Sequence, residues 1–227
     1  MLLLAVAAVA LVAAKPAAAP LLLTEANFDP ALLLPPAPND DSAAGRLELA
    51  QIHLIDQIRT PEEVAHAKAD SATKNASIFA EAMGPGFDLD LLPVSKALFQ
   101  TVRAEEKAAA DRAKDHFRRN RPWITDSSLH PCSTDDEPQS SYPSGHTAMG
   151  YAMGVILARL APSKAPAIMA RAADYAHSRL ICEVHFPADV AAGQAFGTMI
   201  AERLMEQPAF RVQFDAAAAE LRAARLN

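Results

Sequence analysis

Helix-forming patterns cover almost the whole chain after residue 42, and they constrain the fold more than any other feature. Alanine, leucine, glutamate, arginine and methionine dominate these stretches, and apolar residues recur with the period of an amphipathic helix. Alternating β-branched or aromatic runs, which would indicate strands, do not occur. We therefore predict an all-α fold, a compact helical bundle, with helices over residues 44–57, 60–82, 92–119, 143–160, 164–183, 187–206 and 208–225.

Two segments depart from this helical pattern. Residues 24–42 are rich in proline, asparagine and aspartate, and we expect them to form an extended, Pro-rich N-terminal arm. Residues 122–143 form an irregular stretch, and a loop of this length inside a compact domain is usually functional or disordered. The sequence "SYPSGHT" closes this stretch and opens the next predicted helix, with Pro143 expected in its first turn.

The composition is that of one globular domain. The chain has 227 residues, of which 51% are hydrophobic and 21% charged, and it is long enough to bury one substantial core. The formal net charge of −6 argues against a general nucleic acid surface or an anionic membrane surface, because both require an excess of basic residues. Any phosphate chemistry must therefore depend on a local cluster of cations.

The N-terminus, "MLLLAVAAVALVAAKPAAAP", contains an apolar run followed by small residues and prolines. This pattern is typical of a secretory signal, so we expect residues 1–19 to be a signal peptide cleaved near residues 14–19, and residues 20–227 to form a single domain in the periplasm or outside the cell. The run is shorter than the roughly 20 apolar residues that span a bilayer, and the mature chain is expected not to insert into a membrane. The alternative interpretation is an Ala-rich helix packed on the core.

The chain has two cysteines, Cys132 and Cys182. Export into an oxidising compartment would let them pair, whereas without export two buried free thiols would be the better interpretation. For the exported protein we predict a disulfide between them. It would connect the segment before "SYPSGHT" to the segment between Arg179 and His185.

Two stretches carry residues suited to binding an anion. In "KDHFRRNRP", Lys114 and Arg121 are seven residues apart, and on a continuous helix they would project from one face toward the same point. In "SYPSGHT", Ser144, Gly145 and His146 lie at a predicted helix start. A helix N-terminus offers unpaired N–H groups and a positive dipole end to an anion, and glycine allows a close approach.

A third stretch, "SRLICEVHFPAD", contains Arg179, His185 and Asp189. The spacing of four between His185 and Asp189 lets a carboxylate orient one imidazole nitrogen and leave the other free as a nucleophile. Each piece also has an ordinary structural interpretation. The run that includes Arg118 and Arg119 could be a solvated charged face, and a single His-x-x-x-Asp pair is more often a structural hydrogen bond.

Together these stretches match the pattern Lys-x6-Arg-Pro, Pro-Ser-Gly-His and Ser-Arg-x5-His-x3-Asp. The three-part pattern resembles the type-2 phosphatidic acid phosphatase superfamily, and it is far more specific than any single short motif. "SYPSGHT", "SRLICEVHFPADV" and the early "LLLPPAPNDDSAAGRLELAQIHLIDQIRT" are similar to bacterial class A nonspecific acid phosphatases. Vanadium haloperoxidases share the constellation but are typically much longer, and membrane lipid phosphatases share it but require several transmembrane helices.

The resemblance implies a role for each motif residue. His185 would attack phosphorus and form a phosphohistidine, Asp189 would orient it, and His146 would protonate the leaving oxygen. Cations and the helix terminus would hold the phosphate oxygens, through Lys114, Arg121, Ser144, Gly145 and Arg179. Glu183 is expected to point away from the pocket, because a carboxylate there would repel an anionic substrate.

The resemblance implies an exported, metal-independent acid phosphatase that hydrolyses phosphomonoesters through a phosphohistidine and could also transfer the phosphoryl group to alcohols. The alternative enzyme is a vanadate-dependent haloperoxidase-like protein. No cofactor or metal is expected, the partners are small-molecule phosphomonoesters, and similar proteins form homo-oligomers. A degenerate helical binding module would be expected to have lost at least one ionisable group of the pattern, and none is missing.

Overall fold

The computed structural model describes residues 20–227, so the predicted signal peptide lies outside the described residues. These residues form helices and no strand, which confirms the predicted all-α fold. The longer helices are α2 (Ala43–Ile58), α3 (Pro61–Ala72), α5 (Pro93–Phe117), α7 (Gly145–Leu160), α8 (Ala165–Ile181), α9 (Pro187–Met205) and α10 (Pro208–Ala223). Short helical segments lie between them: α1 (Pro30–Leu33), η1 (Ala76–Phe79), α4 (Ala80–Met83), α6 (Pro122–Thr125) and η2 (Pro162–Lys164).

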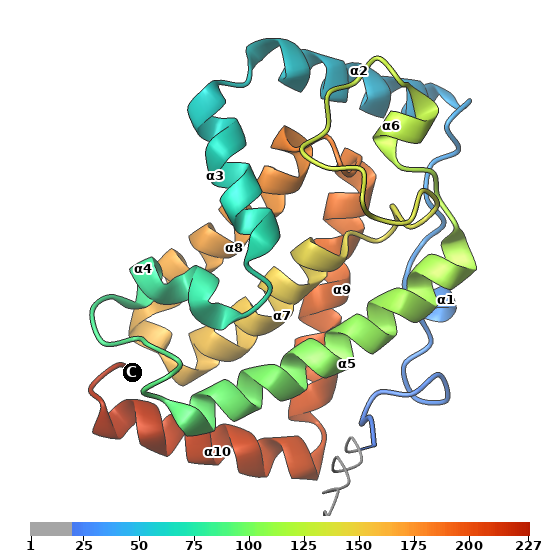
Figure 1. The fold of residues 1–227 in the computed structure, drawn as a ribbon. Coiled ribbons are helices and arrows are strands. Elements are labelled where there is room, and N and C mark those ends of the chain that lie inside the picture. Colours follow the sequence, from blue (N-terminus) through green and yellow to red (C-terminus); the bar gives the residue numbers. More distant parts are fainter. Residues whose placement is uncertain (1–19) are drawn as a thin grey trace, which may run out of the picture.

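Helix α7 forms the centre of the bundle. It packs against α5, α8 and α9, while α10 lies across the end of the bundle where α5 begins (Figure 1). The sequence of α7 is apolar or small almost all round, and Met149, Met153, Ile156 and Leu157 are buried. A helix without a polar face is stable only inside the core, which accounts for its central position.

Two glycines of α9 bring it unusually close to α7. A Cβ atom at Gly193 would lie 2.7 Å from the carbonyl oxygen of Ser144, and one at Gly197 would lie 2.2 Å from that of Ala148. Only glycine permits such an approach, and the two positions are one helical turn apart on the same face. This glycine seam, Gly193 and Gly197, sets the starts of α7 and α9 side by side, and both starts carry motif residues.

Two predicted helix boundaries are wrong, and local side-chain chemistry explains both. The helix predicted over 60–82 ends at Ala72, because Thr73 is extended and the side chain of Asn75 accepts a hydrogen bond from the amide of Ser77 to start η1. The helix predicted over 143–160 begins at Gly145, because Ser144 has extended backbone angles and caps it. Pro143 therefore precedes the helix cap and is not in the first turn.

The helix predicted over 92–119 also ends early. Helix α5 stops at Phe117, and Arg118 adopts a left-handed conformation with φ of 47°, which closes the helix. Lys114 and Arg121 therefore do not share one helical face. Arg121 lies in the following turn, where its amide donates to the carbonyl of Pro138 over 2.8 Å.

The predicted disulfide between Cys132 and Cys182 is present. It links residues 50 positions apart, and the amide of Cys132 also donates to the carbonyl of Cys182 over 3.0 Å. In the chain-entropy model, closing a loop of this length stabilises the fold by up to about 4 kcal/mol. The bond connects the irregular stretch after α6 to the end of α8.

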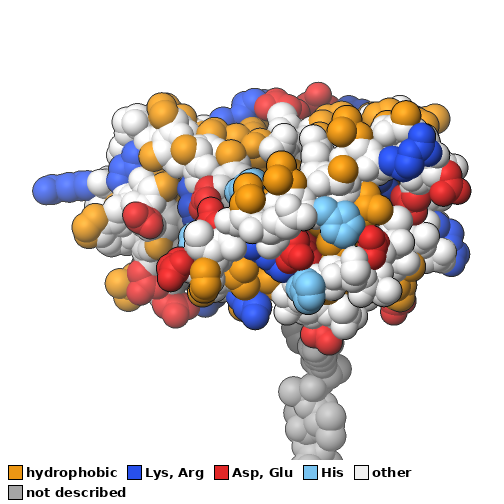
Figure 2. Space-filling model, turned by 90° about the horizontal axis from the view of Figure 1, so that it is seen from above, with side chains coloured by type: hydrophobic (Ala, Val, Ile, Leu, Met, Phe, Trp, Pro, Cys, Tyr) orange, Lys and Arg blue, Asp and Glu red, His pale blue; other side chains and the backbone are white. Residues whose placement is uncertain are grey.

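Residues 20–42 run along α5. The amides of Leu22 and Leu23 donate to the carboxylate of Glu105 over 2.7 and 3.0 Å, and Phe28 and Leu34 are buried in the core. No helix within residues 20–227 is long and apolar enough to cross a membrane. Figure 2 shows one face of the molecule, on which hydrophobic side chains are scattered among acidic and histidine side chains.

Candidate active site

A cavity of about 870 Å³ lies where α5, α7 and the segment before α9 meet. Its lining includes Lys114, Arg121, Gly145, His146 and His185, five of the residues predicted from the sequence. The remaining predicted residues, Ser144, Arg179 and Asp189, are buried and do not line this cavity directly. The structure therefore brings three distant stretches of the chain together at one site.

Arg121 and Arg179, both predicted to bind phosphate, are buried and have donors without partners among the described residues. Arg121 is 1% exposed, and it donates to the carbonyl of Val184 over 2.9 Å and to Ser140 Oγ over 3.0 Å. Arg179 is 3% exposed and donates to Ser71 Oγ. The Nε atoms of both arginines are buried with no hydrogen-bond partner in residues 20–227. Buried donors nearly always have an acceptor, so an anionic ligand would supply the acceptors that these two Nε atoms lack.

Burial lowers the pKa of all three predicted phosphate-binding cations, and repulsion by Arg121 adds to the shift of Lys114 and Arg179, whereas Asp136 and Asp189 oppose the shift of Arg121. Burial, followed by the charge of Arg121, lowers the pKa of Lys114 to about 8. Burial also lowers the pKa of Arg179 to about 10, and Arg121 contributes in the same direction. Cations held close together and away from water are stabilised by a multiply charged anion between them. The arrangement is therefore suited to a phosphate dianion.

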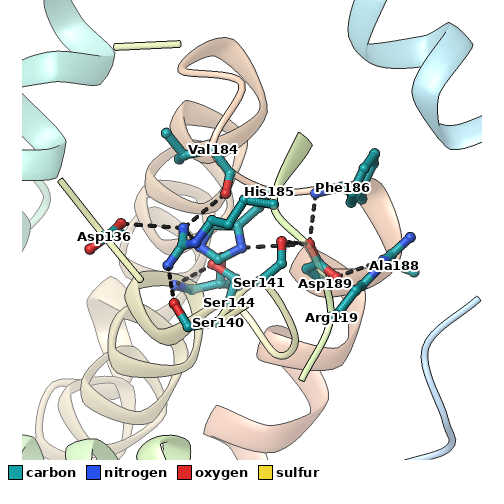
Figure 3. Close-up of polar contacts among 12 residues, drawn as sticks. Arg119, Asp136, Ser140, Ser141, Ser144, Val184, His185, Phe186, Ala188 and Asp189 are labelled. Carbon is teal, nitrogen blue, oxygen red and sulfur yellow. Dashed lines mark hydrogen bonds and ion pairs between the residues drawn. The ribbon is translucent and has the colours of Figure 1, made fainter. Parts of the chain in front are cut away.

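One ring nitrogen of His185 faces Arg121, and the other faces Asp189, which Figure 3 shows beside it. Its Nε2 atom is 3.2 Å from Arg121 Nη1, which is always protonated, so Nε2 is the acceptor and holds a lone pair. Burial, with Arg121, Arg179 and Lys114, lowers the pKa of His185 well below its ordinary value. Burial and the neighbouring cations therefore favour the neutral imidazole.

The predicted hydrogen bond between His185 and Asp189 is not formed. The distance from His185 Nδ1 to Asp189 Oδ2 is 3.6 Å, and Nδ1 has no hydrogen-bond partner among the described residues. Asp189 Oδ2 instead accepts from Ser141 Oγ over 2.6 Å and from the amide of Phe186 over 2.8 Å. These two donors fix the carboxylate, and catalytic hydrogen bonds commonly shorten when substrate binds.

Arg119 is the main site residue that sequence reasoning missed. A solvated face was one interpretation of its charge, but its side chain is buried, and Nη1 lies 2.6 Å from Asp189 Oδ1. Its Nη2 atom lies 2.6 Å from Glu48 Oε2, and its guanidinium stacks over the ring of Phe186. Burial raises the pKa of Asp189, while Arg119 opposes that shift. Arg119 thus anchors the carboxylate that faces His185.

His146 lies against the end of α3. Its Nε2 atom is 3.1 Å from the carbonyl oxygen of Ser71, so Nε2 carries the hydrogen and Nδ1 is the remaining proton site. Burial, followed by the charge of Arg179, lowers the pKa of His146 well below its ordinary value. The early end of α3 places this carbonyl beside the cavity, and no sequence pattern indicated that contact.

The start of α7 is fixed by hydrogen bonds from its cap. The amide of Ser144 donates to the carbonyl of Asp189 over 3.0 Å, and Ser144 Oγ accepts from Thr147 Oγ1 over 3.0 Å. A Cβ atom at Gly145 would lie 3.6 Å from Lys114 Nζ. Glycine at this position leaves space beside the Lys114 ammonium group, next to the free N–H groups of the helix terminus.

Two buried glutamates lie near the site. Glu183 does not line the cavity, as expected, because its carboxylate lies 2.6 Å from Arg59 Nη2 and accepts from the amide of His130. Glu106 does line the cavity, pairs with Arg103, and has no partner for its Oε1 atom. Burial raises the pKa of Glu106 to about 7, although Arg103 and Lys114 act in the opposite direction and Asp111 adds to the increase.

We expect Glu106→Gln to remove a pH-dependent loss of stability. Below pH 4.5, the ordinary pKa of glutamate, Glu106 is protonated in the folded and unfolded states. As the pH rises toward about 7 the unfolded state ionises first, so the free energy of unfolding falls by up to about 3 kcal/mol. The variant should lack this decrease. Urea unfolding at several pH values measures it, with the exposed Glu81→Gln as control, and parallel curves for wild type and Glu106→Gln would contradict the prediction.

One cluster in the described part of the chain resembles a metal site by distance. The potential ligand atoms of His66, Asp70 and Asp174 lie within 4.8 Å of one another. However, the guanidinium of Arg171 pairs with both Asp70 and Asp174, and Asp70 also accepts from Ser178 Oγ. These carboxylates are therefore already neutralised by a cation. The arrangement is suited to holding α3 against α8 and not to coordinating a metal.

Clustered cations, a neutral buried histidine and a free helix terminus around one cavity define an all-α protein with an anion-binding site. The sequence model of the PAP2 superfamily matches residues 96–212, and the chain belongs to this superfamily. An acid phosphatase of Zymomonas mobilis subsp. mobilis is 31% identical over 209 residues, which cover 88% of this chain and 78% of the relative. Non-specific acid phosphatases of Providencia stuartii and Salmonella typhi are 30% and 29% identical, over 84% and 82% of this chain and 79% and 78% of theirs. The resemblance stated from the motifs is thus confirmed.

One solved structure shows the same fold at lower similarity. It is the first transmembrane PAP2 type phosphatidylglycerolphosphate phosphatase from Bacillus subtilis, with a TM-score of 0.51 and 18% identity. The match covers 72% of this chain and 85% of that one. At this identity the likeness concerns the arrangement of helices alone.

Proposed function

We propose that the protein is a metal-independent acid phosphatase that hydrolyses phosphomonoesters through a phosphohistidine at His185. The observation that carries the proposal is the pair Arg121 and His185. A buried guanidinium, whose Nε donor has no partner among the described residues, lies with its Nη1 atom 3.2 Å from the unprotonated Nε2 of His185, in the wall of one cavity. A phosphate held by that arginine would lie beside the nucleophilic nitrogen. The acid phosphatase names of the curated relatives support the same reaction class.

In the proposed mechanism, Nε2 of His185 attacks phosphorus and the bond to the leaving oxygen breaks. Lys114, Arg121, Arg179 and the start of α7 hold the three equatorial oxygens while their charge redistributes. Asp189, anchored by Arg119, stabilises the positive charge that develops on the imidazole. Water then attacks the phosphohistidine and releases inorganic phosphate, and an alcohol in place of water would give phosphotransfer.

His146 is the proposed general acid. Its Nδ1 atom would donate a proton to the leaving oxygen, while Nε2 remains bonded to the carbonyl of Ser71. Its lowered pKa means that the free imidazole is protonated only at acidic pH. A bound phosphate dianion would raise this pKa by attraction. The cations around His185 favour its neutral form, which is the form that can attack phosphorus.

Export to an oxidising compartment is part of the proposal. The disulfide between Cys132 and Cys182 supports it, because such bonds persist outside the reducing cytosol. The apolar run from Leu2 to Ala14 would supply the signal, with residues 20–227 as the mature domain. We also propose that the mature domain forms a homo-oligomer, as the resemblance implies.

Phosphate release from a panel of phosphomonoesters between pH 4 and pH 8, with EDTA present, tests the proposal. We expect undiminished turnover in EDTA and competitive inhibition by vanadate, which mimics five-coordinate phosphorus. Loss of activity in EDTA that a divalent ion restores would contradict the metal-independent mechanism. Oxidation of bromide by the vanadate-loaded protein with peroxide, without phosphatase activity, would favour a haloperoxidase instead.

A further inference from the structure

A second cavity, of about 790 Å³, adjoins the catalytic one. Lys74, Arg103 and Lys107 line both cavities and form the boundary between them. Beyond the boundary, polar and charged side chains such as Asp88, Asp90 and Lys96 share the lining with an apolar floor, which is formed by Ala80, Phe87, Leu89, Phe99 and Ala104. None of the residues with a proposed catalytic role lines this second cavity, so the proposed mechanism leaves it unexplained.

The end of α3 connects the proposed acid His146 to the boundary of the second cavity. His146, the proposed proton donor, contacts the carbonyl of Ser71 at the end of α3. The chain continues from there to Lys74, one of the boundary residues. In an in-line displacement the leaving oxygen faces away from the nucleophile His185 and toward the acid. The alcohol portion of the substrate therefore points toward this boundary.

The charges at the boundary permit an apolar group to pass. Arg103 donates to Glu106, and Lys107 Nζ lies 2.5 Å from Asp111 Oδ2, so each of these two cations is held by a carboxyl group of its own helix. Lys74 is exposed, and its long side chain can turn its ammonium group to water while its methylene groups cover apolar surface. Beyond them, the accessible apolar surface comes from Ala80, Leu89 and Ala104, with the buried rings of Phe87 and Phe99 also in the lining.

We propose that the second cavity binds the alcohol portion of the substrate and selects phosphomonoesters with an apolar body. This inference rests on the proposed phosphatase function. The phosphate would occupy the cation cluster, and the alkyl or aryl part would cross the boundary onto the floor formed by Phe87, Leu89 and Phe99. Each buried methylene group should then strengthen binding by about threefold to fourfold, up to the length of the cavity.

Primary alkyl phosphates test this selection without a change in leaving-group chemistry. We expect kcat/KM for hexyl phosphate to exceed that for ethyl phosphate by at least about tenfold, mainly through KM. Ala80→Trp and Ala104→Trp should fill the cavity from exposed positions and bring this ratio close to one, while ethyl phosphate turnover stays within about twofold of wild type. Ala97→Trp, exposed on α5 outside both cavities, is the matched control and should keep the ratio.

Binding of the corresponding phosphonates, measured by calorimetry, separates this inference from the proposed function. Hexylphosphonate should bind at least about tenfold more tightly than ethylphosphonate even if the protein proves not to be a phosphatase. Equal affinity of the two phosphonates for the wild-type protein would overturn the inference. A preference for the longer chain that survives both tryptophan substitutions would also overturn it, because the chain would then bind elsewhere.

Discussion

Replacing His185 with alanine is expected to lower kcat/KM by at least about 10⁴-fold for every phosphomonoester, whatever the leaving group. The reason is that Nε2 of His185 forms the covalent bond to phosphorus in the proposed mechanism. Without it, only the cation cluster and the acid remain, and no covalent intermediate can form. Initial rates with phenyl, p-nitrophenyl and alkyl phosphates measure the loss.

The matched control is His177→Ala, since this histidine is exposed on α8 and does not line the catalytic cavity. Its kcat/KM should equal that of the wild type. A second readout tests the intermediate directly: labelled substrate, stopped in alkali, should leave a base-stable and acid-labile phosphoryl group on the wild type and none on His185→Ala. An active His185→Ala enzyme that still carries the label would overturn the mechanism.

Replacing His146 with alanine should give a loss that depends on the leaving group. A p-nitrophenolate departs readily without a proton, whereas an alkoxide does not. We therefore expect kcat/KM to fall by roughly 10²–10⁴-fold for an alkyl phosphate and much less for p-nitrophenyl phosphate. The comparison uses kcat/KM because it reports the steps through the first irreversible one, while kcat can be limited by hydrolysis of the phosphohistidine.

The pH profile gives an independent check on His146. With alkyl phosphates the wild type should lose activity as the pH rises, because the acid must be protonated and its pKa is lowered by burial. The alanine variant should lack this limb of the profile. Equal losses of kcat/KM for both leaving groups would mean that His146 only shapes the site.

The sequence was sufficient to predict which residues form the site. It was less successful in predicting the local backbone structure that places them. The motif spacings indicated Lys114, Arg121 and His185, and all three line the same cavity. The helical face predicted for Lys114 and Arg121 was wrong, because a left-handed turn at Arg118 ends α5 between them. Periodicity describes a continuing helix, and it does not predict where an ordinary residue will leave one.

Contacts between distant segments account for what the sequence could not indicate. Nothing in "KDHFRRNRP" distinguishes Arg119 from its charged neighbours, and its role follows only from the positions of Asp189 and Glu48. Similarly, the carbonyl of Ser71 faces His146 only because α3 ends at Ala72. Pairing partners of this kind are set by packing of the folded chain, and no local pattern encodes them.

The glycine seam between α7 and α9 and the floor of the second cavity should differ in how well they tolerate substitution. Any side chain at Gly193 or Gly197 would collide with a backbone carbonyl, so these positions admit no alternative and hold the chemical machinery constant. The floor beside the boundary includes exposed positions such as Ala80 and Ala104, which can change without disturbing that frame. Substitutions at these floor positions should therefore change the preferred substrate without loss of activity. Directed evolution libraries confined to the floor should retain active clones.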